Sequence, residues 1–345
     1  MNQGRERVEK DPVNPATIMR HVYGAYPSFA MLAAMKLDVF TPLQDGSREA
    51  GDLAKSLGVG EEKLIPLLHA LVAADLLQIE NNRFANTGEA GKYLVRGRPD
   101  YIGGLSGFYG NLWQAVLKTA ESIKTGKPQA KLDWHTLPEG ELQRYFRSQL
   151  DNSLRAGQEL MEKLDFSGFE HLLDAGGGSG GVAMSICNRF PSVKATVADL
   201  PAVVRLTERF IAEAGCAAQI SVSATDLCSG SPEGLYDVAV LRAFLQTLGK
   251  EQARAVLRNV GRCMAAGGKL FVIGSILDNS CLSPAASLAW GLVFLNVYDH
   301  GRSYSEKEYA EMLENTGFAD ITIEHNAFVD GYGLITAEKQ RTTSS

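Results

Sequence analysis

The sequence predicts an α/β protein with a helical N-terminal half and a C-terminal half built on a mostly parallel, doubly wound sheet. Its 345 residues, 45% of them hydrophobic, are enough for one large domain or two ordinary ones. Up to about residue 160 the apolar residues recur at helical spacing, and beyond Leu164 short apolar runs alternate with helical segments. We therefore expect two domains, residues 16–160 and 161–340.

The N-terminal half begins with a polar, proline-containing segment, residues 1–15, which is typical of a flexible lead-in. The stretches "ATIMRHVYGAYPSFAMLAAMKLDVF" and "EEKLIPLLHALVAADLL" place apolar residues three and four apart and predict helices. Between them "SREAGDLAKSLGV" adds a helix and a short turn, and "LLQIENNRFANTGEAGKYL" follows as a hairpin. This order is typical of a winged helix.

A winged helix raises DNA binding as one candidate function. The helix that would read DNA begins at Glu61 and has two acids and one lysine before a long apolar stripe, whereas phosphate contacts need an excess of Lys or Arg. We expect no nucleic-acid partner and assign the apolar stripes to a core and a homodimer interface.

Composition favours a small-molecule partner and a cytoplasmic location. The net charge is −6, and the basic residues are spread along the chain. The five cysteines include no CxxC pair and no secretory signal precedes them, so we expect reduced thiols. The longest apolar run, "SLAWGLVFLNVY", is about half of the roughly 20 residues that span a bilayer. We expect no membrane or metal partner.

The C-terminal half alternates strands and helices. "HLLDAGGGSGG" is a short apolar strand that ends in a glycine loop, "VAMSICNRF" is a helix, and "KATVADL" is a second strand. "LYDVAVLRAF" and "GKLFVIGSIL" are further buried strands. This alternation predicts the doubly wound sheet.

The glycine loop indicates a nucleotide-like ligand. Gly176, Gly178 and Gly181 fit the spacing G-x-G-x-x-G, which alone is weak evidence for NAD. Asp174 precedes the loop, where a carboxylate would accept from an ammonium group but repel a pyrophosphate. Asp199 ends the next strand and can bind two ribose hydroxyls. Two acids in these places suit a nucleoside that carries an amino acid, namely S-adenosylmethionine.

Four segments resemble a known family in order and spacing. "LLDAGGGSGG", "VADLPAVV", "ATDLCSGSPEGLYDVAVLRAFLQTL" and "GRSYSEKEYAEMLENTGF" look like the dimeric small-molecule O-methyltransferases related to plant caffeate and bacterial polyketide enzymes. The resemblance runs from "AAMKLDVF" to "GLITAEK". It implies an N-terminal winged-helix dimerisation domain and a Rossmann-like class I methyltransferase domain. It also implies cofactor contacts from the glycine loop, from Asp199 and Leu200 at the ribose, from Asp226 and Leu227 at the adenine, and from Arg242.

The chain departs from this family at three positions of the deprotonation machinery and at one position beside the adenine. Gln246, in "QTL", stands where the family's "HDW" has its general base, and Leu248 replaces an aromatic residue. "VIE" reads "VIG" here, which gives Gly274, and "GRER" reads "GRSY", which gives Ser303. A glutamine cannot accept a proton near pH 7, and losing a general base typically costs about 10²–10⁴-fold in rate.

Three interpretations fit this loss. The acceptor atom already carries a lone pair at neutral pH, as in a thioether, thiolate, amine or acidic phenol. Alternatively the scaffold uses the bound cofactor for a pericyclic or hydroxylation reaction, or His300 has become the base. We favour the first with a thioether acceptor, because neutral sulfur attacking a sulfonium needs no base and alignment supplies most of the acceleration.

A sulfonium reaction needs surroundings that tolerate positive charge, which aromatic faces provide. The candidate aromatic residues are Phe108, Tyr109, Trp113, Phe146, Trp290, Phe294 and Tyr298. An acidic acceptor would also need a cation. Arg147 is the first candidate, because it lies where the family's substrate-contacting helix runs, and Arg302 and His300 are the others.

One branch of the family methylates the thioether of 4-methylthio-2-hydroxybutyrate on the way to dimethylsulfoniopropionate. The missing base, the size and the fold are compatible with that branch, although the chain contains no motif private to it. S-methylation of such a thioether acid is our leading hypothesis. O- or N-methylation of a secondary metabolite and a non-methylating, cofactor-binding relative are the alternatives.

Overall fold

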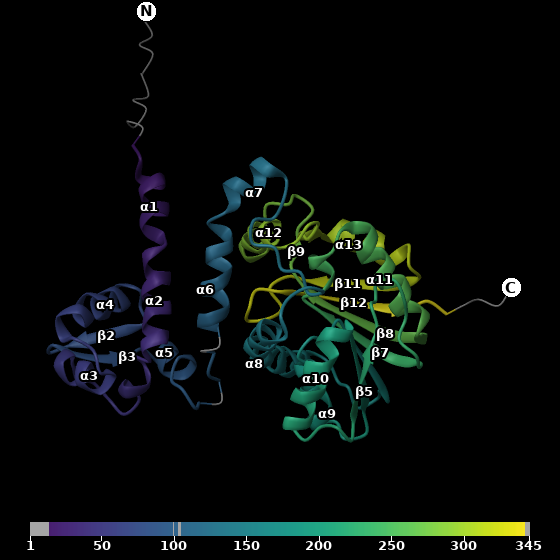
Figure 1. The fold of residues 1–345 in the computed structure, drawn as a ribbon, viewed down its shortest axis with the longest axis horizontal. Helices are drawn as coiled ribbons and strands as arrows, with labels where there is room; N and C mark the ends of the chain where they lie inside the picture. The colour runs from purple at the N-terminus through teal and green to yellow at the C-terminus, as the bar shows by residue number, and fades with distance from the viewer. Residues whose placement is uncertain (1–13, 99, 103–104, 342–345) are drawn as a thin grey trace, which may run out of the picture. The chain divides into compact units, whose positions relative to one another are not determined.

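The computed structural model describes residues 14–98, 100–102 and 105–341, with residues 105–108 described by their backbone alone. Residues 1–13 of the expected lead-in and the side chain of Phe108 therefore lie outside the described residues. The chain divides into two compact units, Met1–Ser106 and Gly107–Ser345, each with its own core (Figure 1).

The first unit combines helices with a small three-stranded sheet. Its elements are α1 (Ala16–Gly24), α2 (Tyr26–Leu37), the 3-10 turn η1 (Thr41–Leu43), β1 (Arg48–Glu49), α3 (Ala50–Leu57), α4 (Glu61–Ala73), β2 (Leu77–Glu80), β3 (Arg83–Asn86) and α5 (Gly88–Tyr93). Gly58 has a φ of +68° and ends α3, so the chain turns directly into α4. The hairpin β2–β3 follows, and β1 adds to it in the order β1-β3-β2. This is the expected winged-helix arrangement.

Helices α1 and α2 leave apolar side chains exposed in a single copy of the chain. Those with relative exposure above 50% are Ile18, Val22, Tyr23, Tyr26 and Phe29. An apolar surface on a helix pair is typical of an interface between proteins.

The second unit contains the seven-stranded sheet. Its helices are α6 (Leu105–Val116), most of which falls in this unit, α7 (Thr119–Thr125), α8 (Glu139–Lys163), α9 (Gly181–Arg189), α10 (Pro201–Glu213), the 3-10 turn η2 (Leu245–Thr247), α11 (Lys250–Arg262), α12 (Ala285–Val297) and α13 (Glu306–Glu314). Its strands are β4 (His171–Ala175), β5 (Lys194–Asp199), β6 (Ile220–Ala224), β7 (Tyr236–Arg242), β8 (Met264–Gly274), β9 (Ile276–Leu277), β10 (Tyr304–Ser305), β11 (Phe318–Glu324) and β12 (Gly333–Lys339).

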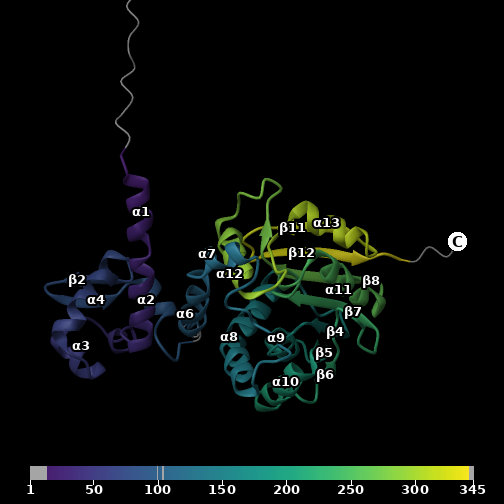
Figure 2. The same cartoon turned by 45° about the horizontal axis from the view of Figure 1, so that its top comes forward.

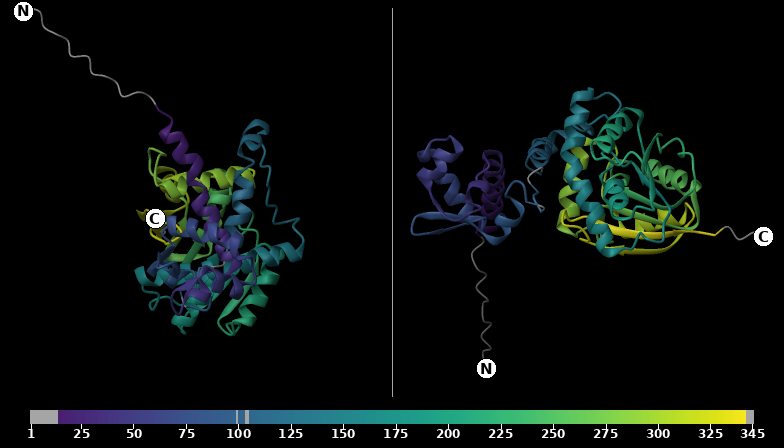
Figure 3. Two further views of the ribbon diagram at one scale, coloured as in Figure 1. Left: turned by 90° about the vertical axis from the view of Figure 1, so that its left-hand side faces the viewer. Right: turned by 90° about the horizontal axis from the view of Figure 1, so that it is seen from below.

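The strand order β11-β12-β8-β7-β4-β5-β6 makes the sheet doubly wound. The five strands from β8 to β6 run parallel, and β12 and β11 are antiparallel additions at one edge (Figure 3). One apolar core joins the sheet to α8, α9 and α10, and a second joins its other face to α11 and α13 (Figure 2). The expected α/β fold is confirmed.

Helices α6, α7 and α8 belong to the second compact unit, although the sequence analysis counted residues up to 160 with the N-terminal domain. In α8, Leu142 and Leu160 are buried in the core on one face of the sheet. A helix that packs on a sheet has the same 3.6-residue periodicity as one in a helical domain, so its partner is not evident from its pattern. Across the described residues, no helix combines the length and apolar character needed to cross a bilayer.

Candidate active site

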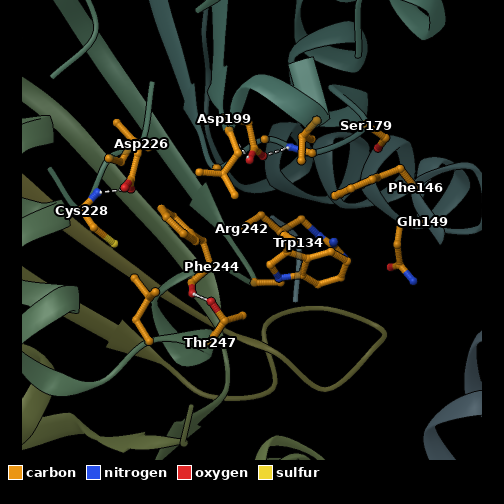
Figure 4. Close-up of a pocket in the computed structure, with 18 of the residues that line it drawn as sticks. Trp134, Phe146, Gln149, Ser179, Asp199, Asp226, Cys228, Arg242, Phe244 and Thr247 are labelled. Carbon is orange, nitrogen blue, oxygen red and sulfur yellow. Dashed lines mark hydrogen bonds between the residues drawn. The ribbon is translucent and has the colours of Figure 1, made fainter. Parts of the chain in front are cut away.

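A pocket of about 300 Å³ opens at the carboxyl ends of strands β4, β5 and β7. In a doubly wound sheet this is the usual ligand position, because the connections that leave the neighbouring strands β4 and β7 run to opposite faces of the sheet. Gly176, Asp199 and Arg242 come from the ends of these strands, and Phe146 and Gln149 come from α8. Figure 4 shows Asp226 and Cys228 at one end of the pocket and Phe146 and Gln149 at the other.

The loop after β4 has a backbone that favours glycine. Gly176 and Gly178 have φ values of +67° and +54°. A Cβ atom at Gly176 would lie 2.5 Å from the ring of Phe244, and one at Gly178 would lie 2.8 Å from the ring of Phe146. Both rings line the pocket. The glycines thus let the backbone approach a ligand beside two aromatic side chains.

Asp199 is fixed at the end of β5 by two backbone donors. The N–H of Gly178 donates to one of its carboxylate oxygens at 2.9 Å and the N–H of Leu200 to the other at 2.7 Å. Burial is the main cause that raises the pKa of Asp199 to about 6. Leu200, Asp226 and Leu227, which were expected to contact the cofactor, also line the pocket.

Asp174 is the one expected cofactor residue that does not line the pocket. Its carboxyl group is 1% exposed and lies beneath Gly177, where a glycine Cβ would be 2.6 Å from its Cγ. The N–H of Ala183 donates to Oδ2 at 3.2 Å, and Oδ1 has no partner among the described residues. Burial raises the pKa of Asp174 to about 7. The carboxyl group therefore packs against the loop at Gly177 and binds the first turn of α9.

Arg242 ends β7 and lines the pocket. Its side chain is 11% exposed, and its guanidinium pairs with Asp330 at 3.1 Å. Its Nε is buried and has no acceptor within the described part of the chain. The group is thus a buried cation with one donor still available.

Gln246 has a fully buried side chain with both ends of its amide hydrogen-bonded. Oε1 accepts from the N–H of Ser275 at 2.8 Å, and Nε2 donates to the hydroxyl of Tyr332 at 3.0 Å. The side chain is 2% exposed and does not line the pocket. The family's base position therefore holds a packed amide.

The three positions of the deprotonation machinery that depart from the family meet in one buried network. A Cβ at Gly274 would overlap Oε1 of Gln246. The hydroxyl of Ser303 lies 2.6 Å from that of Ser275 and donates to the carbonyl of Ser287 at 2.9 Å. Gln246, Gly274 and Ser303 thus share one packing arrangement.

Aromatic side chains extend from the pocket along α12. Phe146 and Tyr298 line the pocket. From Tyr298 the ring centroids follow at 6.1 Å to Phe294, 5.7 Å to Trp290 and 6.3 Å to Tyr109. Trp113 is half-buried on α6 and does not line the pocket. Of the aromatic candidates whose side chains are described, only Phe146 and Tyr298 therefore line the pocket.

The structure does not bring the three expected polar candidates to the pocket. Arg147 pairs with Glu213 at 2.6 Å, with both side chains about half exposed. Arg302 binds both oxygens of Glu308 at 2.8 and 3.0 Å on the surface. His300 is exposed and is not a lining residue. In this structure the side chains of Arg147 and Arg302 bind surface partners and that of His300 is exposed, so their roles toward the acceptor stay predictions.

Several residues that line the pocket were not among those expected from the sequence. They are Trp134, Tyr145, Gln149 and Phe244. The ring centroid of Trp134 lies 4.7 Å from that of Tyr145 and 5.7 Å from that of Phe146, and these three rings form one wall. Trp134 comes from a loop without periodicity, so nothing in the sequence signalled its position.

Comparison with protein families decides the class. Residues 125–319 match an O-methyltransferase domain, and residues 19–96 match an O-methyltransferase dimerisation domain. The chain belongs to the O-methyltransferase family. It is therefore an S-adenosylmethionine-dependent methyltransferase with a dimerisation domain.

Curated relatives span nearly the whole methyltransferase. The 3-hydroxy-5-methyl-1-naphthoate 3-O-methyltransferase of Streptomyces sahachiroi is 28% identical over 92% of this chain and 93% of its own length. The N,N-dimethyltransferase OxyT of Streptomyces rimosus is 26% identical over 95% of this chain and 98% of its own. Human N-acetylserotonin methyltransferase, solved with S-adenosylmethionine, superposes with a TM-score of 0.78 at 21% identity over 96% of this chain and all of that one.

The pocket of this methyltransferase fits its cofactor. The two loop glycines leave room that any Cβ would fill, and Asp199 presents a fixed carboxylate next to them. Phe244 and Leu248 line the same pocket and offer apolar contact for a purine. The residues present therefore provide both the polar and the apolar surfaces that a nucleoside needs.

Proposed function

We propose that this methyltransferase acts on a small molecule whose nucleophilic atom carries a lone pair at neutral pH, without a general base at position 246. When bound, the cofactor's sulfonium supplies the methyl group. The observation that carries the proposal is the buried Gln246 amide, whose two ends are bonded to Ser275 and Tyr332. An amide in this state neither accepts a proton nor reaches the acceptor.

We further propose roles for the cofactor-side residues. Gly176 and Gly178 bring backbone N–H groups to the methionyl part, and Asp199, next to Leu200, accepts from the ribose hydroxyls. Asp226 and Leu227 contact the adenine. Arg242, as a buried cation, faces the cofactor or the acceptor. Asp174 supports the loop and touches the ligand only if the loop shifts.

The thioether acid of the sequence analysis remains one candidate acceptor. Aromatic rings suit a reaction in which a positive charge passes from one sulfur to another, and Phe146, Tyr145 and Trp134 form such a wall. However, Arg147 and Arg302, the cations expected for its carboxylate, lie elsewhere. O- or N-methylation of a secondary metabolite is the second candidate, which the names of the relatives favour.

An acceptor screen with S-adenosylhomocysteine release as readout tests the proposal. It compares 4-methylthio-2-hydroxybutyrate and methionine with catechols, phenols and amines. On the best acceptor, Gln246→His should not raise the rate, because no proton has to be removed. The matched control is Gln246→Asn, which disturbs the same two bonds without adding an ionisable group. If Gln246→His accelerates turnover, or if only hydroxyl acceptors react, the proposal is wrong. If the cofactor binds and nothing is methylated, the non-methylating interpretation replaces it.

We also propose that the enzyme works as a homodimer. The dimerisation-domain match and the exposed apolar face of α1 and α2 support this. Obligate dimers bury about 2,000 Å² or more. Light scattering at micromolar concentration should give about twice the 37.3 kDa chain mass. The double change Val22→Asp and Tyr26→Asp should lower that mass, whereas a wild-type monomer contradicts the proposal.

A further inference from the structure

The Gln246 amide fixes the direction of the Tyr332 hydroxyl. The N–H of Ser275 can only donate, so the amide atom that faces it at 2.8 Å is the oxygen. The nitrogen therefore faces Tyr332 at 3.0 Å, and an amide nitrogen can only donate. The oxygen of Tyr332 is the acceptor in this bond. Its hydrogen must point away from Gln246.

The Tyr332 hydrogen has no acceptor among the residues that the structure describes, where Gln246 is the only partner of the hydroxyl. Tyr332 is 5% exposed, and burial raises its pKa well above the ordinary value, so the group stays protonated. A buried O–H without an acceptor is unfavourable. A bound molecule that offers an acceptor would relieve this cost.

The turn before β12 holds Tyr332 firmly in place. Asp330 pairs with Arg242 at 3.1 Å and also accepts from the N–H of Tyr332. One residue earlier, the N–H of Val329 donates to Glu159 on α8 at 2.9 Å. The turn is thus anchored to two other elements of the second unit, so the hydroxyl is preorganised.

Tyr332 does not line the pocket itself but packs next to Arg242, which does. Its ring centroid is 5.5 Å from that of Trp290, and the guanidinium carbon of Arg242 lies 5.9 Å from its centroid. Arg242 lines the pocket, and its Nε is a second buried donor without a described acceptor. Two such donors on neighbouring side chains are matched by a ligand that offers acceptor atoms to both.

We propose that Tyr332 is a specificity-determining residue whose hydroxyl donates to a carbonyl or carboxylate oxygen of the methyl acceptor, with Gln246 as the positioning residue that keeps it a donor. The inference rests on the proposed function, since it assumes that position 246 removes no proton. It adds the substrate class: besides its nucleophilic atom, the methyl-accepting substrate carries an oxygen that accepts a hydrogen bond. Where the family's base would take a proton, this site offers one hydrogen bond.

Matched pairs of probes test this inference in the full-length enzyme saturated with S-adenosylhomocysteine. The pairs are 4-methylthio-2-hydroxybutyrate with 4-methylthiobutan-2-ol, and 4-aminobenzoate with 4-methylaniline. Each pair differs in one carboxylate. Calorimetry should show that at least one acid binds about 10- to 100-fold more tightly than its neutral partner, as expected for a hydrogen bond to a charged group. Tyr332→Phe should reduce that preference to less than about threefold.

Two further variants separate this role from a structural one. Tyr309→Phe removes a hydroxyl that is equally buried but has no partner among the described residues, so the acid preference should stay. Gln246→Glu gives Tyr332 an acceptor within the protein, so the preference should be lost although the phenol remains. Thermal melts confirm that each variant is folded.

The inference is overturned if no acid binds better than its neutral partner, or if Tyr332→Phe keeps the preference. It is also overturned if Tyr332→Phe weakens S-adenosylhomocysteine instead, because the donor then serves the cofactor's own carboxylate. Faster turnover in Gln246→His would contradict the proposed function and leaves these binding results unaffected, so the two failures are distinguishable.

Discussion

The cofactor side of the pocket is made of backbone and strand-end carboxylates, whereas its opposite wall is made of aromatic side chains from several elements. On the first side, Gly176, Gly178 and Asp199 lie within 24 residues of one another and are joined by a direct hydrogen bond. On the second, Tyr145 comes from α8 and Tyr298 directly follows α12, so the residues of this wall lie far apart in the sequence. The nucleoside side is thus formed by one short segment of the chain, whereas the acceptor side depends on the packing of elements that lie far apart in the sequence.

Because of this difference, the two sides carry different information: one reports the reaction class and the other the substrate. A local structure depends on a short motif, so it is retained with the fold and reports what the enzyme transfers. A wall assembled from distant elements changes when any one of them shifts or is substituted. Relatives with this fold accordingly include an O-methyltransferase and an N,N-dimethyltransferase.

The largest effect is expected on the cofactor side, from Gly176→Ala. The added Cβ would lie 2.5 Å from Phe244 at a φ of +67°, so either the loop or the pocket ring must move. Calorimetry should show a loss of S-adenosylmethionine affinity of at least about 100-fold. Gly215→Ala is the matched control, because Gly215 has a φ of +70° but nothing within 4 Å of the new Cβ. It should cost about 1 kcal/mol of stability and leave the affinity unchanged; an equal loss in both variants would remove the steric argument.

An intermediate effect is expected from the acid beneath the loop. Burial raises the pKa of Asp174 from 3.8 to about 7. Between pH 4 and 7 the folded protein therefore holds a proton that the unfolded chain releases, and the contribution of Asp174 to the free energy of unfolding falls as pH rises through this window. Relative to wild type, Asp174→Asn should gain about 2 kcal/mol more at pH 8 than at pH 5 in urea unfolding.

The control for this pH dependence is Asp165→Asn. Hydrogen bonds from Ser167 lower the pKa of Asp165, so its carboxyl group is ionised in both the folded and the unfolded state between pH 5 and 8. Its substitution should change stability equally at both pH values. An equal change for Asp174→Asn would show that the buried acid is not protonated near neutral pH.

The smallest effect is expected from the two surface arginines. Arg147→Ala and Arg302→Ala remove partly exposed ion pairs with Glu213 and Glu308, and such pairs contribute little. The KM for the acceptor found in the screen should change less than about twofold. A tenfold rise in either variant would mean that the side chain turns into the pocket when substrate binds, and that the acceptor wall is less fixed than the cofactor side.

The fold and the cofactor side could be predicted because their determinants are local. A glycine loop after an apolar strand, followed by an acid at the end of the next strand, has few structural solutions. The acceptor side could not be predicted in the same way. Phe146 and Arg147 are adjacent in sequence but about 100° apart around α8, so one lines the pocket and the other pairs with α10. Only the packing of α8 decides which residue faces inward.

The role of Gln246 was predicted in part. The sequence indicated that no base stands at this position, and the buried amide agrees with that. It did not indicate that Tyr332 is the hydrogen-bond partner of Gln246, because Tyr332 is 86 residues away in the sequence. The antiparallel pairing of β12 with β8 brings the two residues together. Long-range pairs of this kind leave no periodic pattern in a single sequence.

The contact between Gly274 and Gln246 makes the order of past and future substitutions matter. Any side chain gained at position 274 first meets Oε1 of Gln246, and any loss of Gln246 first leaves the N–H of Ser275 and the hydroxyl of Tyr332 without this partner. Each single substitution toward a histidine-based site therefore costs stability, although the combined substitutions need not. The site behaves as an epistatic ratchet, in which single reversions are disfavoured. Directed evolution toward a histidine-based site would therefore have to vary positions 246, 274 and 303 together in one library.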